Sequence, residues 1–500
     1  MPSLSLLAIT PRTATILAAP DGARFAQPRP LDWRLVERGR VVTEGQMDTA
    51  VLFLDHLTPG TAYWLDTGLG RLALTTPRCA GRVDVTDHGA RGGLDCTDAF
   101  ARALDALPEG GTLYVPAGRF ETLPLMLKPA MTLHLERDAI LTAPSGREGW
   151  PKLPARDDTG RVIGTWEGLP DRCFAALVTA RDCPGLAITG RGTIDGGGAS
   201  GDWWTWPKET RDGARRPRAV HLAYSDDVSL TGVTIRNAPS WTVHPYRCDR
   251  LTAAALTIQN PPDSPNTDGL NPESCRDVTI AGIDFSVGDD CIAIKAGKRA
   301  PDQDDHLAPT QNIRISHCRM QRGHGAVVIG SEMSGGVSDI SVSACDFLGT
   351  DRGLRIKTRR GRGGMIRNIS LSDVVMQDVA TPLAINAFYF CDADGKDDWV
   401  QSRDRSLADD TTPQITGITM TRVTAQGVSC AAAAILGLPE APVTDVKLTD
   451  FTVSYHPDAT PTPPLMALHV PPVAAAGLLA EFAVVTGTVT EITTAAEAAC

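Results

Sequence analysis

The sequence predicts an all-β protein, a right-handed parallel β-helix that follows a small N-terminal β-sandwich. Three observations predict it: a strand-like pattern that returns at short intervals, the lack of long helical segments between the repeats, and a different, turn-rich pattern near the N-terminus. A chain of 500 residues exceeds the usual single-core domain. We therefore expect two domains, residues 1–80 and residues 81–500.

Residues 1–80 alternate apolar and polar positions in short runs that Pro and Gly turns interrupt. Such runs are typical of a β-sandwich. The segment from Leu57 to Leu65 resembles the part of fibronectin type III domains in which a tyrosine, here Tyr63, closes a corner of the sandwich. We place the domain boundary between Pro77 and Arg82.

A single amphipathic helix is expected just after this boundary, ending before Pro108. Thr97 or Asp98 would cap it, and the apolar positions that share one face are Phe100, Ala103, Leu104 and Leu107. A helix here would cover the open end of a sheet.

The repeated pattern is a polar residue, alternating β-branched positions and a turn. It begins at Gly185, Asp227, Arg250, Asp277, Asn312, Asp339, Asn368, Gly417 and Asp445. The typical interval of about 23 to 35 residues is the length of one rung of a β-solenoid. A doubly wound α/β fold would need a helix in each interval. Longer intervals near residues 140–175, 201–218 and 388–412 predict loops that build cleft walls. The sequence of the Ala- and Pro-rich tail after Pro461 is uninformative about structure.

Charge and hydropathy exclude several classes of partner. The net charge of −11 argues against nucleic acid, which needs a broad basic surface. No apolar run is long enough to span a bilayer, so we expect no membrane domain. The first twenty residues lack a basic region before their apolar part. We therefore expect a cytoplasmic protein, with a periplasmic or secreted one as the alternative.

Twelve cysteines lie between Cys79 and Cys500 without the Cys-x-x-Cys spacing of metal sites. We expect them to be small buried side chains and expect no metal and no cofactor. Cys248 with Cys275, and Cys318 with Cys345, recur in the same phase of neighbouring repeats. Strands about 4.8 Å apart permit a disulfide there without requiring one.

Three carboxylates stand out, because Asp268 lies about one rung before the adjacent pair Asp289 and Asp290. On a solenoid they would lie side by side, and hydrolysis of a glycoside needs one carboxylic acid and one carboxylate. Neighbours on a flat strand face opposite sides, so Asp289 and Asp290 share a cleft only if Gly288 allows a bend. The alternative is that these residues form rung corners or bind an ion.

Downstream, His324 stands between two glycines, where the backbone turns tightly. Arg355 and Lys357 are two positions apart and therefore project from one face of a strand, where they can bracket a sugar carboxylate. They belong to a basic run from Arg352 to Arg367 that predicts an anion-binding wall, against the alternative of a solvated loop.

The segments Asn266-Thr267-Asp268, Gly288-Asp289-Asp290, Gly323-His324-Gly325 and Arg355-Ile356-Lys357 resemble, in this order and spacing, the polygalacturonase family, glycoside hydrolase family 28. Gly192 to Gly198, Trp203-Trp204 and Asn237 to Pro245 resemble its bacterial and plant branches. The resemblance covers about residues 81 to 455.

The resemblance implies a role for each matching residue. Asp289 would be the general acid, and Asp268 and Asp290 would hold and deprotonate the attacking water. His324 would tune the acid and contact substrate, and Asn266 would position the sugar or Asp268. Tyr389 would stack on a sugar ring. His244 would either bind substrate or be purely structural.

The family resemblance implies an inverting hydrolase of α-1,4-linked galacturonate in pectin-derived chains. Exo action is favoured over endo action because the N-terminal domain and long loops resemble exo-acting bacterial relatives and would close one end of the cleft. The alternatives are an endo-acting enzyme, a non-catalytic β-helix that binds acidic polysaccharide and a calcium-dependent pectate lyase. The expected partner is galacturonate oligo- or polysaccharide; the sequence does not indicate an oligomeric state.

Overall fold

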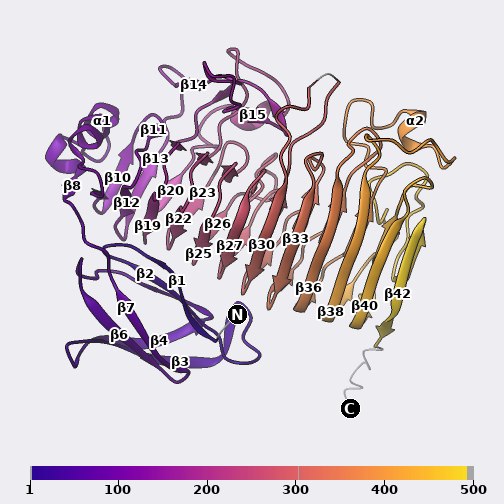
Figure 1. Ribbon diagram of the computed structural model, residues 1–500, viewed down its shortest axis with the longest axis horizontal. Coiled ribbons are helices and arrows are strands. Elements are labelled where there is room, and N and C mark those ends of the chain that lie inside the picture. The colour runs from indigo at the N-terminus through magenta and orange to yellow at the C-terminus, as the bar shows by residue number, and fades with distance from the viewer. Residues whose placement is uncertain (1–2, 302, 493–500) are drawn as a thin grey trace.

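A computed structural model describes residues 3–301 and 303–492, and it contains a small antiparallel part beside a long stack of parallel strands (Figure 1). Strands β1 (Leu4–Ile9), β2 (Ala14–Ala18) and β5 (Val51–Leu54) form one antiparallel sheet. Strands β3 (Ala26–Glu37), β4 (Arg40–Thr49), β6 (Ala62–Thr67) and β7 (Gly70–Thr75) form the other. Side chains from both sheets, including Ile16, Leu35 and Leu65, pack between them. The backbone N–H of Thr58 donates to the Tyr63 hydroxyl at 3.0 Å, which closes the corner that the sequence predicts.

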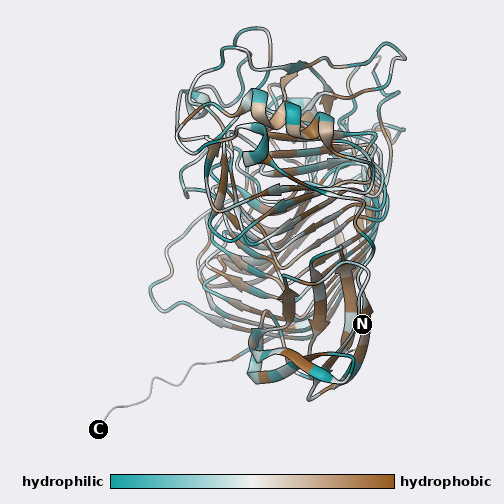
Figure 2. Cartoon of the chain, turned by 90° about the vertical axis from the view of Figure 1, so that its left-hand side faces the viewer, coloured by the Kyte–Doolittle hydropathy of each residue, from teal (hydrophilic) through white to brown (hydrophobic). Residues whose placement is uncertain are grey.

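The solenoid begins with β8 (Arg82–Asp84), the short 3-10 helix η1 (Val85–His88) and helix α1 (Thr97–Ala106), which lies across the end of the rungs (Figure 2). Helix α1 buries Phe100, Ala103 and Leu104 as expected. The expected cap is wrong, because Thr97 lies inside the first turn and its backbone N–H donates to the side chain of Asp95 at 2.9 Å.

The largest sheet has 21 strands and runs the length of the solenoid. With β8, its strands are β9 (Thr112–Val115), β10 (Gly118–Glu121), β12 (Thr132–Leu135), β13 (Ala139–Thr142), β19 (Ala187–Gly190), β20 (Thr193–Asp195), β22 (Ser229–Thr231), β23 (Thr234–Arg236), β25 (Thr252–Ala254), β26 (Thr257–Gln259), β27 (Arg276–Ala281), β28 (Asp284–Ser286), β30 (Thr310–Ser316), β31 (Arg319–Gln321), β33 (Val337–Ser343), β34 (Asp346–Leu348), β36 (Met365–Gln377), β38 (Gln414–Val428), β40 (Val443–Tyr455) and β42 (Ala483–Glu491).

A second parallel face carries the candidate site. Its first sheet holds β11 (Leu125–Met126), β18 (Val178–Arg181), β21 (Val220–Ala223) and β24 (Val243–Tyr246). Its second sheet holds β29 (Asp290–Ile294), β32 (Gly325–Gly330), β35 (Arg352–Lys357), β37 (Thr381–Asn386), β39 (Ala431–Leu436) and β41 (Ala476–Glu481). Between the two sheets, Leu270 pairs singly with Val243 and with Ile292, so the ladder continues through the rung that carries Asp268.

Side chains at equal positions of successive rungs stack and build the core. Phe285, Met320 and Phe347 are direct partners on β28, β31 and β34, and all three are buried. Each rung thus buries apolar surface only by covering the next, which is how a solenoid grows without a wide core. The predicted parallel β-helix is confirmed. Strands β41 and β42 also add a rung in the tail for which the sequence predicts no structure.

Loops leave the stack at the three long intervals and carry the remaining elements. These are β14 (Lys152–Leu153), β15 (Thr165–Trp166), β16 (Leu169–Pro170), β17 (Cys173–Phe174), the 3-10 helix η2 (Trp203–Thr205) and α2 (Asp398–Gln401). Over residues 3–301 and 303–492 no helix has the length and apolar character to cross a membrane. Cys248 donates its backbone N–H to Cys275 Sγ at 3.5 Å, and the cysteines that the structure describes are unpaired; Cys500 lies outside the described residues.

The N-terminal sheets pack against turns of the solenoid. Val51 contacts Ala254 and Ala281 in a shared apolar cluster. A Cβ on Gly232 would lie 2.5 Å from the Phe53 ring, and one on Gly282 would lie 2.4 Å from Val51, so both turns need glycine for this close approach. We propose residues 1–80 and 81–500 as two domains joined between β7 and β8.

The domain proposal predicts that Gly282→Leu separates the two parts, because its side chain would collide with Val51. Protease should then cut between residues 76 and 81, while the specific activity stays within about twofold of the parent. Gly349→Leu is the control, since Gly349 has nearly the same φ, 64° against 61°, but nothing within 4 Å of its added Cβ. Equal protease resistance of the two variants would contradict the packing of the domains described here.

Candidate active site

A cavity of about 460 Å³ opens over β29, β32 and β35. Among its walls are eight of the nine residues that the sequence singles out: Asn266, Asp268, Asp289, Asp290, His324, Arg355, Lys357 and Tyr389. His244 is the ninth and does not line it. Residues from five separate stretches of sequence therefore meet because consecutive rungs place them side by side.

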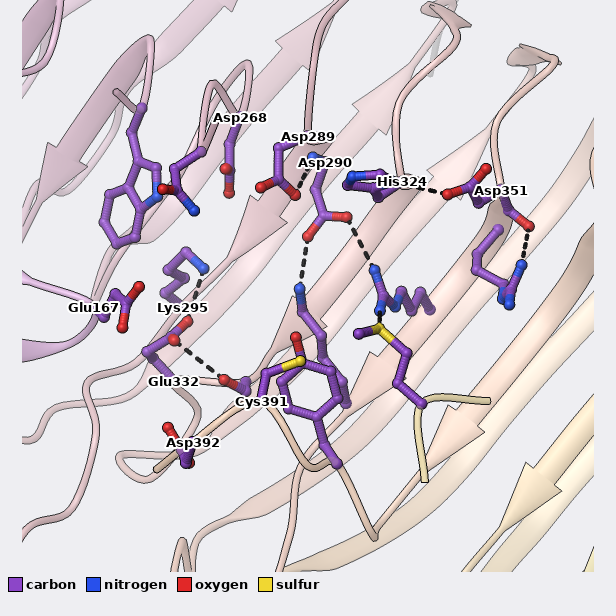
Figure 3. A pocket seen from close by; sticks show the side chains of 18 of the residues that line it. Glu167, Asp268, Asp289, Asp290, Lys295, His324, Glu332, Asp351, Cys391 and Asp392 are labelled. Carbon is purple, nitrogen blue, oxygen red and sulfur yellow. Dashed lines mark hydrogen bonds and ion pairs between the residues drawn. The ribbon is translucent and has the colours of Figure 1, made fainter. Parts of the chain in front are cut away.

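Asp289 and Asp290 both face this cavity (Figure 3) because the chain bends between β28 and β29. The bend falls at Gly288 and Asp289, and the Asp290 N–H donates to Asp289 Oδ1 at 3.0 Å. A Cβ on Gly288 would lie only 2.5 Å from the carbonyl oxygen of Ser264. Glycine thus permits the close backbone approach, and the bend on which the shared cleft depends is present.

The pKa values of two of the three carboxyl groups are raised. Burial, then repulsion from Asp289, raises the pKa of Asp268 to about 8. Burial, then repulsion from Asp290, also raises the pKa of Asp289. Asp268 accepts from Asn271 Nδ2 at 2.8 Å, which fixes its orientation. The unliganded site therefore contains protonated aspartic acid near neutral pH.

Asp290 differs because it has two cationic partners. Lys357 Nζ lies 2.7 Å from its Oδ2, and Arg355 Nη1 lies 3.4 Å from its Oδ1. Burial acts to raise the pKa of Asp290, but Lys357 and Arg355 outweigh it and hold the pKa below the ordinary value. Arg355 and Lys357 line the cavity and also pair with Asp290, so their contact with a sugar carboxylate stays a prediction.

His324 is held by a partner that the sequence did not indicate. Its Nδ1 lies 2.7 Å from Asp351 Oδ2, and its backbone N–H donates to the Asp289 carbonyl at 3.1 Å. The hydrogen bond to Asp351 raises the pKa of His324 to about 9, with burial opposing and Asp289 assisting. His324 is therefore a cation beside the acid group at neutral pH.

The structure contradicts substrate binding by His244. Its side chain is 0% exposed and its Nε2 lies 2.8 Å from Glu273 Oε2. The reason is the loop before β18, which covers this part of the sheet face: His221, the partner of His244 on β21, lies with Nε2 3.3 Å from the Ile163 carbonyl oxygen. The structural alternative for His244 stands.

Asn266 and Tyr389 line the cavity from loops. Asn266 Oδ1 accepts from Arg216 Nη2 at 2.6 Å, and Arg216 is fully buried, so the Asn266 side chain is fixed. The Tyr389 ring lies beside the two cations, with its centroid 5.6 Å from Lys357 Nζ and 5.9 Å from Arg355 Cζ. Both residues are placed to contact a bound molecule.

The basic run is not a free anion-binding wall. Arg359 pairs with Asp392 and Asp394, Arg360 pairs with Glu440, and Arg362 pairs with Asp392. These arginines are buried and neutralised by carboxylates on loops. The members of the run that line the cavity are Arg352, Arg355 and Lys357, so the predicted anion-binding wall is limited to these three residues.

Loops, and not the N-terminal domain, surround the cavity. None of its lining residues comes from the described residues 3–80. Glu167, Lys208, Asp392 and Met466 line it from four separate loops. The expectation that the N-terminal domain closes one end of the cleft is therefore wrong, whereas the expectation for the loops agrees with their position.

Lys295 and Glu332 also line the cavity, and the sequence interpretation did not single them out. Lys295 follows β29 directly, Glu332 follows β32 after Ser331, and Lys295 Nζ lies 2.7 Å from Glu332 Oε2. Since Ile294 pairs with Ile329, a count of residues puts Lys295 opposite Gly330 and would not by itself have identified Glu332 as its partner.

Comparison with known proteins identifies the family that this chain matches. The family model for glycosyl hydrolases family 28 matches residues 165–463. A probable polygalacturonase of Vitis vinifera is 33% identical over 368 residues, covering 71% of this chain and 70% of the relative. An endo-polygalacturonase of Pectobacterium carotovorum subsp. carotovorum is 31% identical, covering 59% and 72%. The crystal structure of an exopolygalacturonase from Thermotoga maritima, 25% identical, superposes with a TM-score of 0.65 over 82% of this chain and 91% of that chain.

The contact between His324 and Asp351 predicts that Asp351→Asn lowers the pKa of His324 from about 9 toward the ordinary value of 6.5. The folded-state pKa is raised by the anion, so the wild-type ring stays protonated between these values and the variant ring does not. NMR titration of the ring protons measures this. An unchanged pKa would show that Asp351 does not hold the charge on His324.

Proposed function

The chain belongs to glycosyl hydrolases family 28, and we propose that it hydrolyses α-1,4-linked galacturonan from one chain end with inversion at the anomeric carbon. The observation that carries this proposal is the group of Asp268, Asp289 and Asp290 in one cavity, with opposite pKa shifts on Asp289 and Asp290. Glycoside hydrolysis needs such a pair, one carboxyl protonated and one ionised.

In the proposed reaction Asp289 donates its proton to the glycosidic oxygen as the bond to the anomeric carbon breaks. A water molecule attacks that carbon from the opposite face and gives its proton to Asp290, which Lys357 and Arg355 keep ionised. Asp268, which holds a proton in the free site, orients the water by hydrogen bonding. Asp290 is thus the principal base; after the reaction it releases this proton to solvent, and Asp289 takes one up from solvent.

Charge in this part of the cavity favours an acidic sugar. Asp268, with a pKa of about 8, is protonated near neutral pH. Even if Asp289 is counted as ionised, three carboxylates, Asp289, Asp290 and Asp351, face four cationic side chains, Arg352, Arg355, Lys357 and His324. The excess of positive charge attracts a uronate carboxylate, although some N–H groups of Arg355 and Lys357 already pair with Asp290. A neutral sugar would not neutralise this excess positive charge.

The covering loop supports exo action. The Tyr224 hydroxyl donates to the Val162 carbonyl at 2.8 Å, and the Lys298 N–H donates to the Gly168 carbonyl at 2.9 Å, so residues 162–168 cross several rungs. This segment covers the sheet face before the catalytic rungs. A sugar chain then has room to continue on one side only, which requires a chain end. Endo action is the alternative, because one relative, from Pectobacterium, is an endo-polygalacturonase.

We also propose that the protein acts outside the cytoplasm, in the periplasm or after secretion, because a polymeric anion does not cross a membrane unaided. This favours the alternative location over the cytoplasmic one. Recovery of the protein only from the cytoplasmic fraction of its source cells would reject it.

The catalytic assignment predicts that Asp289→Asn lowers kcat on oligogalacturonate by about 10²- to 10⁴-fold, since general acid catalysis contributes that much. Proton NMR during hydrolysis by the parent should show the inverted anomer first. Activity equal to that of the parent would remove Asp289 from the reaction, and release of the retained anomer would remove the role of Asp290.

Exo action predicts a single short product from the first seconds of reaction with polygalacturonate, and a slow fall in viscosity relative to the reducing ends formed. Chromatography of early products measures this. A ladder of intermediate oligomers at early times would instead establish endo action.

A further inference from the structure

A buried ion pair lines the cavity away from the catalytic aspartates. Lys295 and Glu332 follow β29 and β32, whereas Asp289 and Asp290 stand at the start of β29 (Figure 3). Lys295 is 4% exposed and Glu332 is 7% exposed, yet both line the cavity. The proposed reaction uses neither of them.

Both side chains retain hydrogen-bonding capacity toward the cavity. Glu332 Oε2 accepts from Lys295 at 2.7 Å and its Oε1 accepts from Ser331 Oγ at 3.1 Å, which leaves at least one lone pair on each oxygen. Lys295 has three N–H groups, of which Glu332 takes one. The pair therefore presents an acceptor next to a donor, the arrangement that two neighbouring sugar hydroxyls complement.

An aromatic face adjoins the pair. Lys295 Nζ lies 4.7 Å from the centroid of the Trp241 ring, and Trp241 also lines the cavity. Aromatic rings offer an apolar surface to the C–H groups of a bound sugar while polar groups beside them hold its hydroxyls. Trp241, Lys295 and Glu332 together have the composition of a sugar-binding site.

The local charge selects hydroxyl over carboxylate. The charged groups that line this part of the cavity are already paired: Glu167 with Lys208, Glu332 with Lys295, and Asp392 with Lys298, Arg359 and Arg362. Burial acts to raise the pKa of Glu332, but Lys295 and then Arg362 hold it well below the ordinary value, so Glu332 stays charged. A uronate carboxylate would find Lys295 and Lys208 already paired with carboxylates, whereas a hydroxyl can donate to Glu332.

We propose that Glu332 and Lys295 bind ring hydroxyls of the galacturonate residue in the cavity and restrict the enzyme to residues whose hydroxyls are free. The inference rests on the proposed function. A substituted or missing hydroxyl leaves a buried charge without its partner, which sites of this kind reject strongly. The pair thus determines specificity without taking part in proton transfer.

The test compares kcat/KM for three oligogalacturonates of equal length: unmodified, O-acetylated on ring hydroxyls, and carrying a 4,5-unsaturated terminal residue that lacks one hydroxyl. The parent should prefer the unmodified oligomer over at least one of the others by about 10- to 100-fold, the range for a hydrogen bond to a charged group. Glu332→Gln should reduce that preference at least severalfold, because the amide removes the charge at nearly constant shape. Lys295→Met should act in the same direction.

Glu440→Gln is the matched control. Glu440 is also a buried carboxylate, paired with Arg360 at 2.5 Å, but it does not line the cavity. Loss of stability alone would change kcat/KM for all three oligomers by one factor, as we expect for Glu440→Gln.

Equal cleavage of the three oligomers by the parent, or the same loss on all three in Glu332→Gln, would overturn the inference and leave the proposed function intact. Absence of any hydrolysis by the parent would instead reject the proposed function, and this inference with it.

Discussion

In-register stacking of parallel rungs is the constraint on which the structure depends. Each backbone N–H of a strand finds its acceptor on the neighbouring rung, so the spacing of strands sets the distance between residues that are some thirty positions apart in sequence. The register brings Asp290 beside Gly325 on the next rung. Arg355 pairs with Val328 one rung further along, from where its side chain reaches back to Asp290. The same backbone pairing that stabilises the solenoid therefore also assembles the cavity.

Within that frame, the position of two cations gives chemically identical side chains different proton affinities. Asp289 and Asp290 are neighbours in sequence and both are buried, yet Lys357 and Arg355 contact Asp290 alone. Burial disfavours the charged form of each carboxyl group, and direct ion pairing reverses that effect for one of them. A cation contacting both carboxyl groups equally would leave no division between acid and base.

Sequence reasoning located the acids well because rung register needs only a count of residues. The parallel fold and the place of Asp268 beside Asp289 and Asp290 followed from periodicity and spacing. The bend at Gly288 was a condition of that placement, and the role of His324 followed from the family resemblance. Sequence reasoning failed where a distant loop intervenes, because no local pattern indicates that the loop before β18 covers His244. It also missed Asp351 as the partner of His324, although the Asp351 N–H donates to the Gly323 carbonyl on the neighbouring rung at 3.0 Å. It did not indicate that Arg355 and Lys357 pair with Asp290, since a shared strand face does not identify which anion they contact. The cap of α1 was misplaced because Asp95, two residues earlier, supplies the accepting oxygen.

The contact between the N-terminal sheets and the solenoid extends along the stack. Thr13 lies 2.9 Å from Thr189, Phe53 fits over Gly232, Val51 fits over Gly282, and Arg24 pairs with Asp346. The N-terminal sandwich thus contacts several successive rungs of the solenoid at fixed intervals. Duplication or loss of a single rung within that span would shift every later contact out of place. The contact with the small domain is therefore compatible with only one number and pitch of the rungs beside it.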